Sequence, residues 1–274
     1  MKRMIYQVSV GPRSTLYDAC IKSVAAYCDR HGFKHVVQTS PKLRIAPDIF
    51  DTMRSPESYG KYGGYLPIYE KENAFNYIND FDQIAIIDAD IFIREDAPSV
   101  FDDLTPGCAF GAVIEREMPL VLAYQNKIIS YSKMQYATLH NETDFKPNKL
   151  GYEFANMGMI VLDCKLFNDN HLKNRSAREF LEAPEFKRFV DGIGCWKWST
   201  DQTLLNFYIK KNKVPFANMS HVWNGLYTAN AKISECNFIH FFLKDKLPDR
   251  GESLFNSDSS LSENYVVVEK IINV

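Results

Sequence analysis

The first forty residues alternate between short apolar runs and one longer amphipathic stretch. Residues 5–10 form an apolar run that a Gly-Pro pair closes, and residues 35–38 form another. Between them, apolar side chains recur with helical spacing. Ser14 is a residue type that begins helices, and Gly32 is one that ends them. The pattern predicts a strand, a helix and a second strand, joined as a right-handed parallel βαβ unit.

Later apolar runs, bounded by polar residues, are typical of buried strands. They occupy residues 83–87, 108–114, 158–162 and 238–242. Helical spacing predicts helices over 66–81, over 176–190 with a break near Pro184, and over 203–211. Residues 41–64 are rich in Pro and Gly and are expected to form a loop over a binding face. Residues 119–150 show no clear periodicity, so we expect an irregular segment there.

Strands that alternate with helices indicate an α/β fold with a mixed, mainly parallel central sheet flanked by helices. The chain has 274 residues, enough for one sizeable domain. We expect this domain to span residues 1–248. Residues 249–264 are polar and rich in Ser, and residues 265–274 are apolar again. Residues 249–274 are therefore predicted to be a linker and a C-terminal tail.

Composition narrows the function classes. Apolar residues make up 46% of the chain and charged residues 24%, with a net charge of −2. These values fit an ordinary globular protein and weigh against a nucleic-acid or anionic-membrane binder. No uncharged apolar run approaches the roughly 18 residues of a membrane span, and the start is too weakly apolar for a secretory signal. Six scattered cysteines without a CxxC pair predict reduced thiols, so we expect a cytoplasmic protein.

Two aspartates follow the apolar run at 84–87 directly. In an extended backbone, Asp88 and Asp90 point to the same side. Their carboxylates would then converge at the carboxyl end of a buried strand, where open α/β sheets bind ligands. Because two close anions repel each other, a hard divalent cation that also takes phosphate oxygens fits between them. The alternative is an exposed turn that happens to contain two aspartates.

Four segments, in this order, resemble motifs of the GT-A glycosyltransferases, especially the glycogenin and bacterial galactosyltransferase (GT8-like) family. They are 84–93 (IAIIDADIFI), 154–162 (FANMGMIVL), 199–206 (STDQTLLN) and 240–246 (HFFLKDK). The sequence departs from the family where Leu243 replaces a glycine and where Leu247-Pro248 stands for Pro-Trp. The resemblance implies a GT-A, Rossmann-like fold, with a nucleotide-binding half at 1–110 and a donor-sugar and acceptor half at 111–248.

The resemblance also implies an activity: metal-dependent transfer of a sugar from a nucleotide-diphosphate sugar to a hydroxyl acceptor. UDP-sugars are the favoured donors, glycans or glycoconjugates the acceptors, and the anomeric configuration is expected to be retained. Mn²⁺ or Mg²⁺ would be held by Asp88, Asp90 and His240, and a nitrogen ligand leans toward Mn²⁺. The expected catalytic residues are Asp201 and Gln202. The expected donor-binding residues are Val8, Ser9, Val10, Asp88, Ala89, Asn156, Gly158 and Lys246, with Lys244 as an alternative to Lys246.

Several of these residues have a plain structural alternative. His240 could be a buried core histidine, Asp201 could cap the following helix, and Lys71 could lie on a solvent-exposed helix face. Asp201 or Glu115 could serve as general base if the enzyme inverts configuration. Aromatic residues that could stack on an acceptor sugar or on the nucleobase are Trp196, Trp198, Trp223, Tyr227, Tyr6 and Tyr17.

Three other functions remain open at this point. A phosphatase of the haloacid-dehalogenase type also places DxD after an apolar strand, but normally near the start of the chain and before a Thr or Gly. A sugar-1-phosphate nucleotidyltransferase would need a Gly-rich basic loop after the first strand, of which Gly11-Pro12-Arg13 is a poor version. The third is a sugar-binding module without turnover.

Overall fold

A six-stranded mixed sheet forms the centre of the computed structural model, which describes residues 1–12, 14–48 and 60–255. In spatial order its strands are β2 (Lys34–Gln38), β1 (Arg3–Val8), β3 (Gln83–Ile87), β8 (Ala155–Asp163), β5 (Phe110–Ile114) and β9 (Phe216–Asn218). The pairs β1–β2, β1–β3 and β5–β9 are parallel, whereas β8 runs antiparallel to both β3 and β5. The predicted mixed, mainly parallel sheet and the opening βαβ unit are confirmed.

A smaller three-stranded sheet lies beside the first. Its order is β10 (Gly225–Leu226), β11 (Phe238–His240) and β4 (Ile91–Ile93). The antiparallel pairing of β11 with β4 sets His240 opposite Ile91, directly after the DxD segment. A two-stranded hairpin consists of β6 (Pro147–Asn148) and β7 (Gly151–Tyr152).

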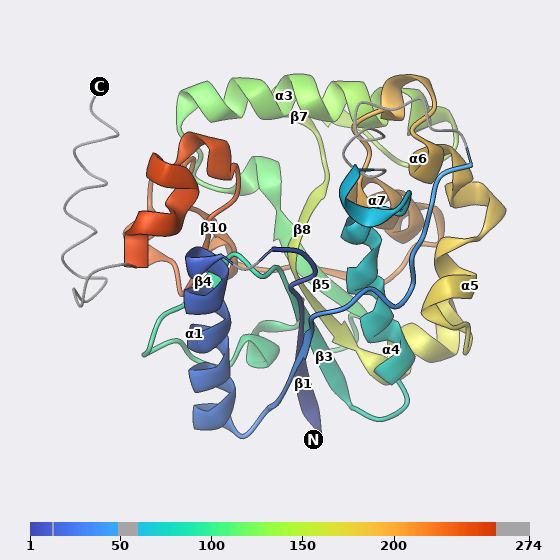
Figure 1. Ribbon diagram of the computed structural model, residues 1–274. Coiled ribbons are helices and arrows are strands. Elements are labelled where there is room, and N and C mark those ends of the chain that lie inside the picture. Colours follow the sequence, from blue (N-terminus) through green and yellow to red (C-terminus); the bar gives the residue numbers. More distant parts are fainter. Residues whose placement is uncertain (13, 49–59, 256–274) are drawn as a thin grey trace.

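Helices cover both faces of the central sheet (Figure 1). Helix α1 (Thr15–His31) begins at Ser14, whose side chain accepts a hydrogen bond from the Tyr17 amide, and ends at Gly32 in the left-handed conformation. Both ends were predicted. The other helices are α3 (Leu122–Tyr136), α4 (Cys164–Phe167), α5 (Ala177–Leu181), α6 (Lys187–Asp191) and α7 (Asp201–Lys211). Figure 1 shows α1 on one side of the sheet, α4 and α5 on the other, and α3 across the end of the sheet.

Shorter helical turns complete the chain. The longest is the 3-10 helix η1 (Pro67–Tyr77), within the predicted helix 66–81. The remaining turns are η2 (Val100–Asp103), η3 (Glu115–Glu117), η4 (Ala137–Asn141), η5 (Asn168–Leu172), η6 (Pro184–Phe186), η7 (Gly194–Trp196), η8 (His221–Trp223), η9 (Ile233–Glu235), η10 (Lys244–Lys246) and η11 (Pro248–Phe255). The turn η6 separates α5 from α6 at Pro184, as predicted. Among the described residues, none of the helices combines the length and apolar character that crossing a membrane requires.

Three expectations from the sequence were wrong. Residues 119–150 contain the regular helix α3, whose buried face includes Ser132 and Gln135, so its hydrophobic periodicity is weak. Strand β1 ends at Val8 rather than at residue 10. Residues 249–255, expected as the start of a linker, belong to η11, and Glu252 there accepts hydrogen bonds from the hydroxyl of Ser14 and the amide of Thr15. The rest of the expected linker and tail lies outside the described residues, as do residues 49–59 of the expected loop.

Strand β3 is fully enclosed, and all five of its residues are buried. Ile84 and Ile86 pack into the core on one face, and Ala85 and Ile87 pack into the core on the other. Apolar side chains are therefore needed at four consecutive positions, 84–87, rather than at alternate positions. The strand lies in the centre of the sheet, and Asp88 follows directly at its carboxyl end.

Candidate metal centre and surrounding cavity

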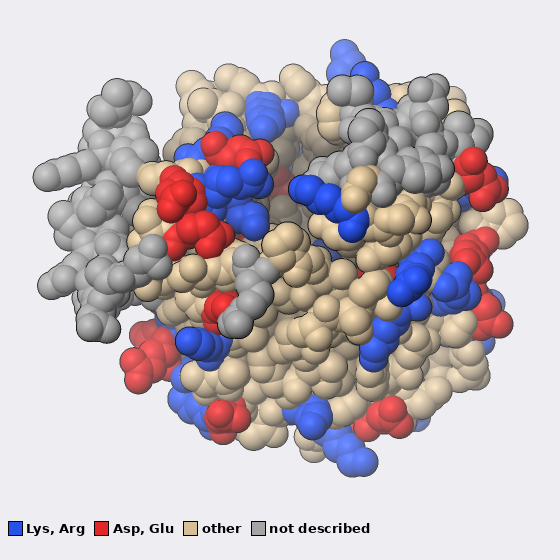
Figure 2. Space-filling model, viewed as in Figure 1, with Lys and Arg blue, Asp and Glu red and all other residues tan. Residues whose placement is uncertain are grey.

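A cavity of about 1040 Å³ opens at the carboxyl ends of β1 and β3. Figure 2 shows a hollow in this face of the molecule, with lysine and arginine side chains on both sides of it. Every predicted site residue except Lys246 lines the cavity. These residues are Val8, Ser9, Val10, Asp88, Ala89, Asp90, Asn156, Gly158, Asp201, Gln202 and His240. Segments far apart in the sequence thus meet at one place.

The two aspartates of the DxD segment meet His240 in this cavity. The Nε2 atom of His240 lies 3.3 Å from Oδ1 of Asp90 and 3.7 Å from Oδ2 of Asp88. One ligand atom from each of the three residues falls within 4.8 Å of the others. Two carboxylate oxygens and one imidazole nitrogen are a donor set that suits a divalent cation with open coordination positions. The three residues therefore fit the predicted metal, and Nε2 of the buried His240 faces the two carboxylates.

Burial and mutual charge shift the pKa values of these groups in different directions. Burial lowers the pKa of His240, but Asp90 and Asp88 raise it more, so it lies above its ordinary value. For Asp90, burial raises the pKa, yet His240 and Lys244 bring it below its ordinary value. For Asp88 burial dominates, and its pKa is raised despite Lys71 and His240.

Lys71 connects the DxD segment to the segment at 199–206. Its ammonium nitrogen lies 2.9 Å from Oδ1 of Asp88, 2.7 Å from Oδ2 of Asp201 and 3.1 Å from the carbonyl oxygen of Met157. These contacts use all three N–H bonds of the ammonium group. Burial lowers the pKa of Lys71, but Asp201 and Asp88 raise it well above its ordinary value. The expected solvent-exposed helix face was wrong, because η1 is an internal helix.

The start of α7 holds the two expected catalytic residues. Thr200 caps the helix by accepting a hydrogen bond from the Gln202 amide, so the capping role considered for Asp201 belongs to its neighbour. Asp201 is buried against Lys71. The side-chain oxygen of Gln202 accepts a hydrogen bond of 3.3 Å from the amide of Met157 in β8. Both side chains are therefore fixed at the cavity wall.

The lysine expected at residue 246 is exposed and lies outside the lining of the cavity. The alternative, Lys244, has its ammonium nitrogen 3.6 Å from the ring centroid of Tyr17, which lines the cavity, and its charge lowers the pKa of Asp90. Leu243, where the resembled family has glycine, adopts the left-handed conformation with φ of 55°. This turn orients η10 so that Lys244 is the nearer cation.

Two of the six aromatic residues considered for stacking line the cavity, and four do not. Trp198 and Tyr17 line the cavity, and Trp198 is exposed. Trp223 is buried, packs edge-on against Phe238 and donates a hydrogen bond to Asp103, so it is a core residue. The remaining candidates are also engaged outside the cavity lining: Trp196 against Phe189, Tyr227 against Phe241, and the hydroxyl of the fully buried Tyr6 with Asn73 and Gln38.

Glu115 lines the cavity, and each of its side-chain oxygens already accepts a hydrogen bond. Oε1 accepts a hydrogen bond from the hydroxyl of Tyr124, and Oε2 accepts one from the side-chain amide of Asn156, both of 2.8 Å. Burial raises the pKa of Glu115, although these two hydrogen bonds lower it in part. Its contacts argue against the general-base role considered for it.

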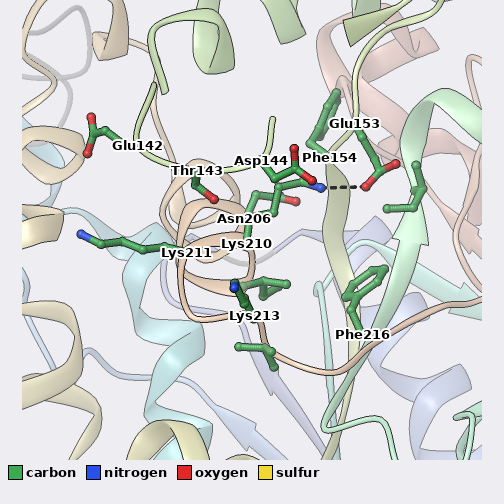
Figure 3. Close-up of a pocket in the computed structure, with 13 residues that line it drawn as sticks. Glu142, Thr143, Asp144, Glu153, Phe154, Asn206, Lys210, Lys211, Lys213 and Phe216 are labelled. Atoms are coloured by element: carbon green, nitrogen blue, oxygen red, sulfur yellow. Dashed lines mark hydrogen bonds and ion pairs between the residues drawn. The ribbon is translucent and has the colours of Figure 1, made fainter. Parts of the chain in front are cut away.

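A second cavity of about 490 Å³ lies between the end of α7 and strands β5, β8 and β9 (Figure 3). Lys210, Lys211 and Lys213 line it together with Glu142, Asp144 and Glu153. The ammonium of Lys210 pairs with Glu153 at 2.7 Å. Positive and negative side chains are evenly mixed there, so this cavity favours no charged ligand and lacks the convergent acids of the first.

Comparisons with known proteins bear on the fold. No protein-family model and no curated protein matches the sequence. Among solved structures, mouse xyloside xylosyltransferase 1 in its apo form is 13% identical, with 90% of this chain and 100% of that chain covered and a TM-score of 0.50. The galactosyltransferase LgtC in complex with donor and acceptor sugar analogues is 14% identical, with 86% of each chain covered and a TM-score of 0.49. A glycosyltransferase involved in glycosylation of the major capsid of PBCV-1 is 11% identical, with 98% and 100% covered and a TM-score of 0.41. The strand topology and the match to xyloside xylosyltransferase 1 together identify the fold of this chain as the GT-A fold.

Proposed function

We propose that this protein is a metal-dependent glycosyltransferase that moves a sugar from a nucleotide-diphosphate sugar to a hydroxyl group of a glycan or glycoconjugate. The observation that carries the proposal is the meeting of Asp88 and Asp90 with the distant His240 in the largest cavity described here. That cavity also contains the two residues expected to contact the donor sugar, Asp201 and Gln202.

The three ligands explain how the donor would be activated. Asp88, Asp90 and Nε2 of His240 would hold Mn²⁺ or Mg²⁺, with the nitrogen favouring Mn²⁺. A bound divalent cation acts as a Lewis acid on the negative charge that develops on the departing diphosphate. Lys244, which lies over Tyr17 near Asp90, would add a second positive charge at the same oxygens.

The donor sugar would lie against the wall formed by α7 and β8. Asp201 would accept hydrogen bonds from sugar hydroxyls while Lys71 balances its charge. Gln202, held by the amide of Met157, would stabilise positive charge developing at the anomeric carbon. We propose retention of configuration because the enzymes that the sequence resembles retain it.

The other end of the cavity suits the nucleotide. Val8, Ser9 and Val10, together with Ala89, line it where β1 and β3 end. We propose that these residues hold the nucleoside, with UDP preferred because of the resemblance noted in the sequence. The exposed Trp198 is the one remaining tryptophan candidate for stacking on the acceptor sugar. All six cysteines are free thiols, which supports a reducing compartment such as the cytoplasm.

The test is slow hydrolysis of a panel of nucleotide sugars by the whole chain with Mn²⁺. We expect release of nucleoside diphosphate from at least one donor, and its loss on addition of EDTA. Asp90→Ala should lose more than about tenfold in Mn²⁺-dependent affinity for UDP, measured by calorimetry. Asp96→Ala, an exposed aspartate three residues after β4, is the matched control. Release of inorganic phosphate from phosphomonoesters would instead indicate a phosphatase, and donor binding without hydrolysis would indicate a binding module.

A further inference from the structure

An unbroken series of hydrogen bonds connects the far side of the His240 ring to a buried carboxylate. Nδ1 of His240 lies 2.9 Å from Oδ1 of Asn224, and Nδ2 of Asn224 donates to Oδ1 of Asn156 at 2.8 Å. Nδ2 of Asn156 donates to Oε2 of Glu115 at 2.8 Å, and the hydroxyl of Tyr124 donates to its other oxygen. Both asparagines, His240 and Glu115 are buried.

The direction of these hydrogen bonds follows from one donor that cannot be reversed. The backbone N–H of Gly158 donates to Oδ1 of Asn156 at 2.9 Å, so that atom must be the oxygen. Asn224 must therefore turn its NH₂ group toward Asn156 and its oxygen toward His240. An amide oxygen only accepts, so Nδ1 of His240 must carry the proton. In the neutral ring, the lone pair therefore lies on Nε2, on the side of Asp88 and Asp90.

We propose that Asn224 and Asn156 are positioning residues that hold His240 in the Nδ1–H tautomer and couple it to the negative charge of Glu115. A metal-binding histidine generally donates its second N–H to an acceptor that fixes the ring and makes the ligand nitrogen more basic. Here the acceptor is an amide, and the carboxylate lies two hydrogen bonds further on. In a buried series each hydrogen bond polarises the next, so the negative charge of Glu115 makes Nε2 of His240 more basic.

This inference rests on the proposed function, since it assigns Nε2 of His240 to a metal ion. A purely structural role is the competing explanation, because buried amides need partners wherever they occur. The two differ in what they predict for the imidazole. A structural role affects melting temperature alone, whereas a positioning role determines which ring nitrogen is protonated and how tightly Mn²⁺ binds.

The experiment uses the full chain labelled with ¹⁵N-histidine, without metal, at a pH high enough that the ¹⁵N shifts of His240 no longer change with pH and report the neutral ring. The ¹⁵N shifts of wild type should report protonated Nδ1 for His240. Asn224→Leu should convert His240 wholly or partly to the Nε2–H tautomer, because Asp90 then offers the nearer acceptor. In calorimetry, the same variant should bind Mn²⁺ about 10–100-fold more weakly.

Two further variants separate the explanations. Asn224→Asp keeps an acceptor for Nδ1–H and should retain the wild-type tautomer. Glu115→Gln removes the charge, while its oxygen can still accept from Asn156 and its NH₂ group can donate to the hydroxyl of Tyr124. This variant should therefore retain the tautomer and weaken Mn²⁺ binding less than Asn224→Leu does. Asn230→Leu, at a buried asparagine outside the series, is the control for folding.

Wild-type shifts that place the proton on Nε2 would overturn the proposal, as would a folded Asn224→Leu protein with unchanged shifts and unchanged Mn²⁺ affinity. If Asn224→Leu does not fold, Glu115→Gln decides by calorimetry, because Mn²⁺ affinity equal to that of the wild type would contradict the coupling to Glu115. Absence of Mn²⁺ binding by wild type would instead reject the proposed function. The metal-free tautomer would still show whether the hydrogen-bond series orients the ring.

Discussion

The imidazole ring of His240 lies directly against Gly158. A Cβ atom built at residue 158 would be 2.4 Å from Cε1 and 2.7 Å from Nδ1 of the ring, far inside normal contact distance. From the sequence, Gly158 was expected to leave room for the donor sugar. In the structure, the missing side chain leaves room for the imidazole.

Substitution of Gly158 tests this contact. Gly158→Ala should displace the His240 ring and lower Mn²⁺ affinity by about tenfold or more, since small displacements of ligand groups weaken metal sites. Calorimetry with Mn²⁺ measures the loss. Gly60→Ala is a suitable control, because a Cβ there would contact no atom of the described residues within 4 Å. Equal Mn²⁺ affinity of the two variants would show that the ring can move aside without consequence.

Metal binding should strengthen with rising pH. The pKa of His240 lies above its ordinary value of 6.5 because Asp90 and Asp88 outweigh the effect of burial. A proton on Nε2 competes with the metal, so affinity should fall about tenfold for each pH unit below this pKa. We expect the increase in melting temperature caused by Mn²⁺ to be larger at a pH of about 8.5 than at about 6.

Without metal, the contribution of His240 to the stability of the fold should show the opposite dependence on pH. A raised folded-state pKa means that protonated His240 stabilises the fold fully below its unfolded pKa, and that this stabilisation is lost as pH rises through the folded pKa. His240→Ala should remove both trends. A Mn²⁺-induced shift of equal size at both pH values would argue that His240 is not a ligand.

Lys71 should be important for stability as well as for the site. Lys71→Met leaves Asp88 and Asp201 without their shared cation, and removing one partner of a buried ion pair costs about 3–5 kcal/mol. Urea unfolding measures the loss in free energy, with Lys22→Met at an exposed position of α1 as the control. Lys71→Met/Asp201→Asn should recover part of the loss, because one unpaired charge is then neutralised. A loss no greater than that of the control would mean that water replaces the lysine at no cost.

Local sequence patterns were sufficient to predict those features of the fold that depend on one short segment of the chain. The apolar run before Asp88 and the ends of α1 have strong signals in the sequence, and both were predicted. The order of four motifs was enough to bring His240 to the DxD segment, although the pairing of β11 with β4 that places it there joins residues far apart.

The role of Lys71 had no comparable signal. It lies on a 3-10 helix whose buried residues include Glu70, Glu72 and Asn73, so neither helical periodicity nor polarity marks the helix as internal. Asn224 is similar, because its importance depends on Asn156 and Gly158, which come from another strand. A single sequence contains no record of such contacts between distant side chains.

Strand β8 extends past the end of β3, and its register with β5 shifts between Ala112 and Val113. Beyond the end of β3, side chains rather than a neighbouring strand form hydrogen bonds with the backbone of β8. The amide of Asn206 exchanges two hydrogen bonds with the backbone of Ala155, and Met157 is held by Gln202 and Lys71. Residues expected to select the donor are thus also structural supports of the sheet. Substitution of Gln202, which we propose to contact the donor sugar, should therefore lower the stability of the fold as well as change the sugar preference.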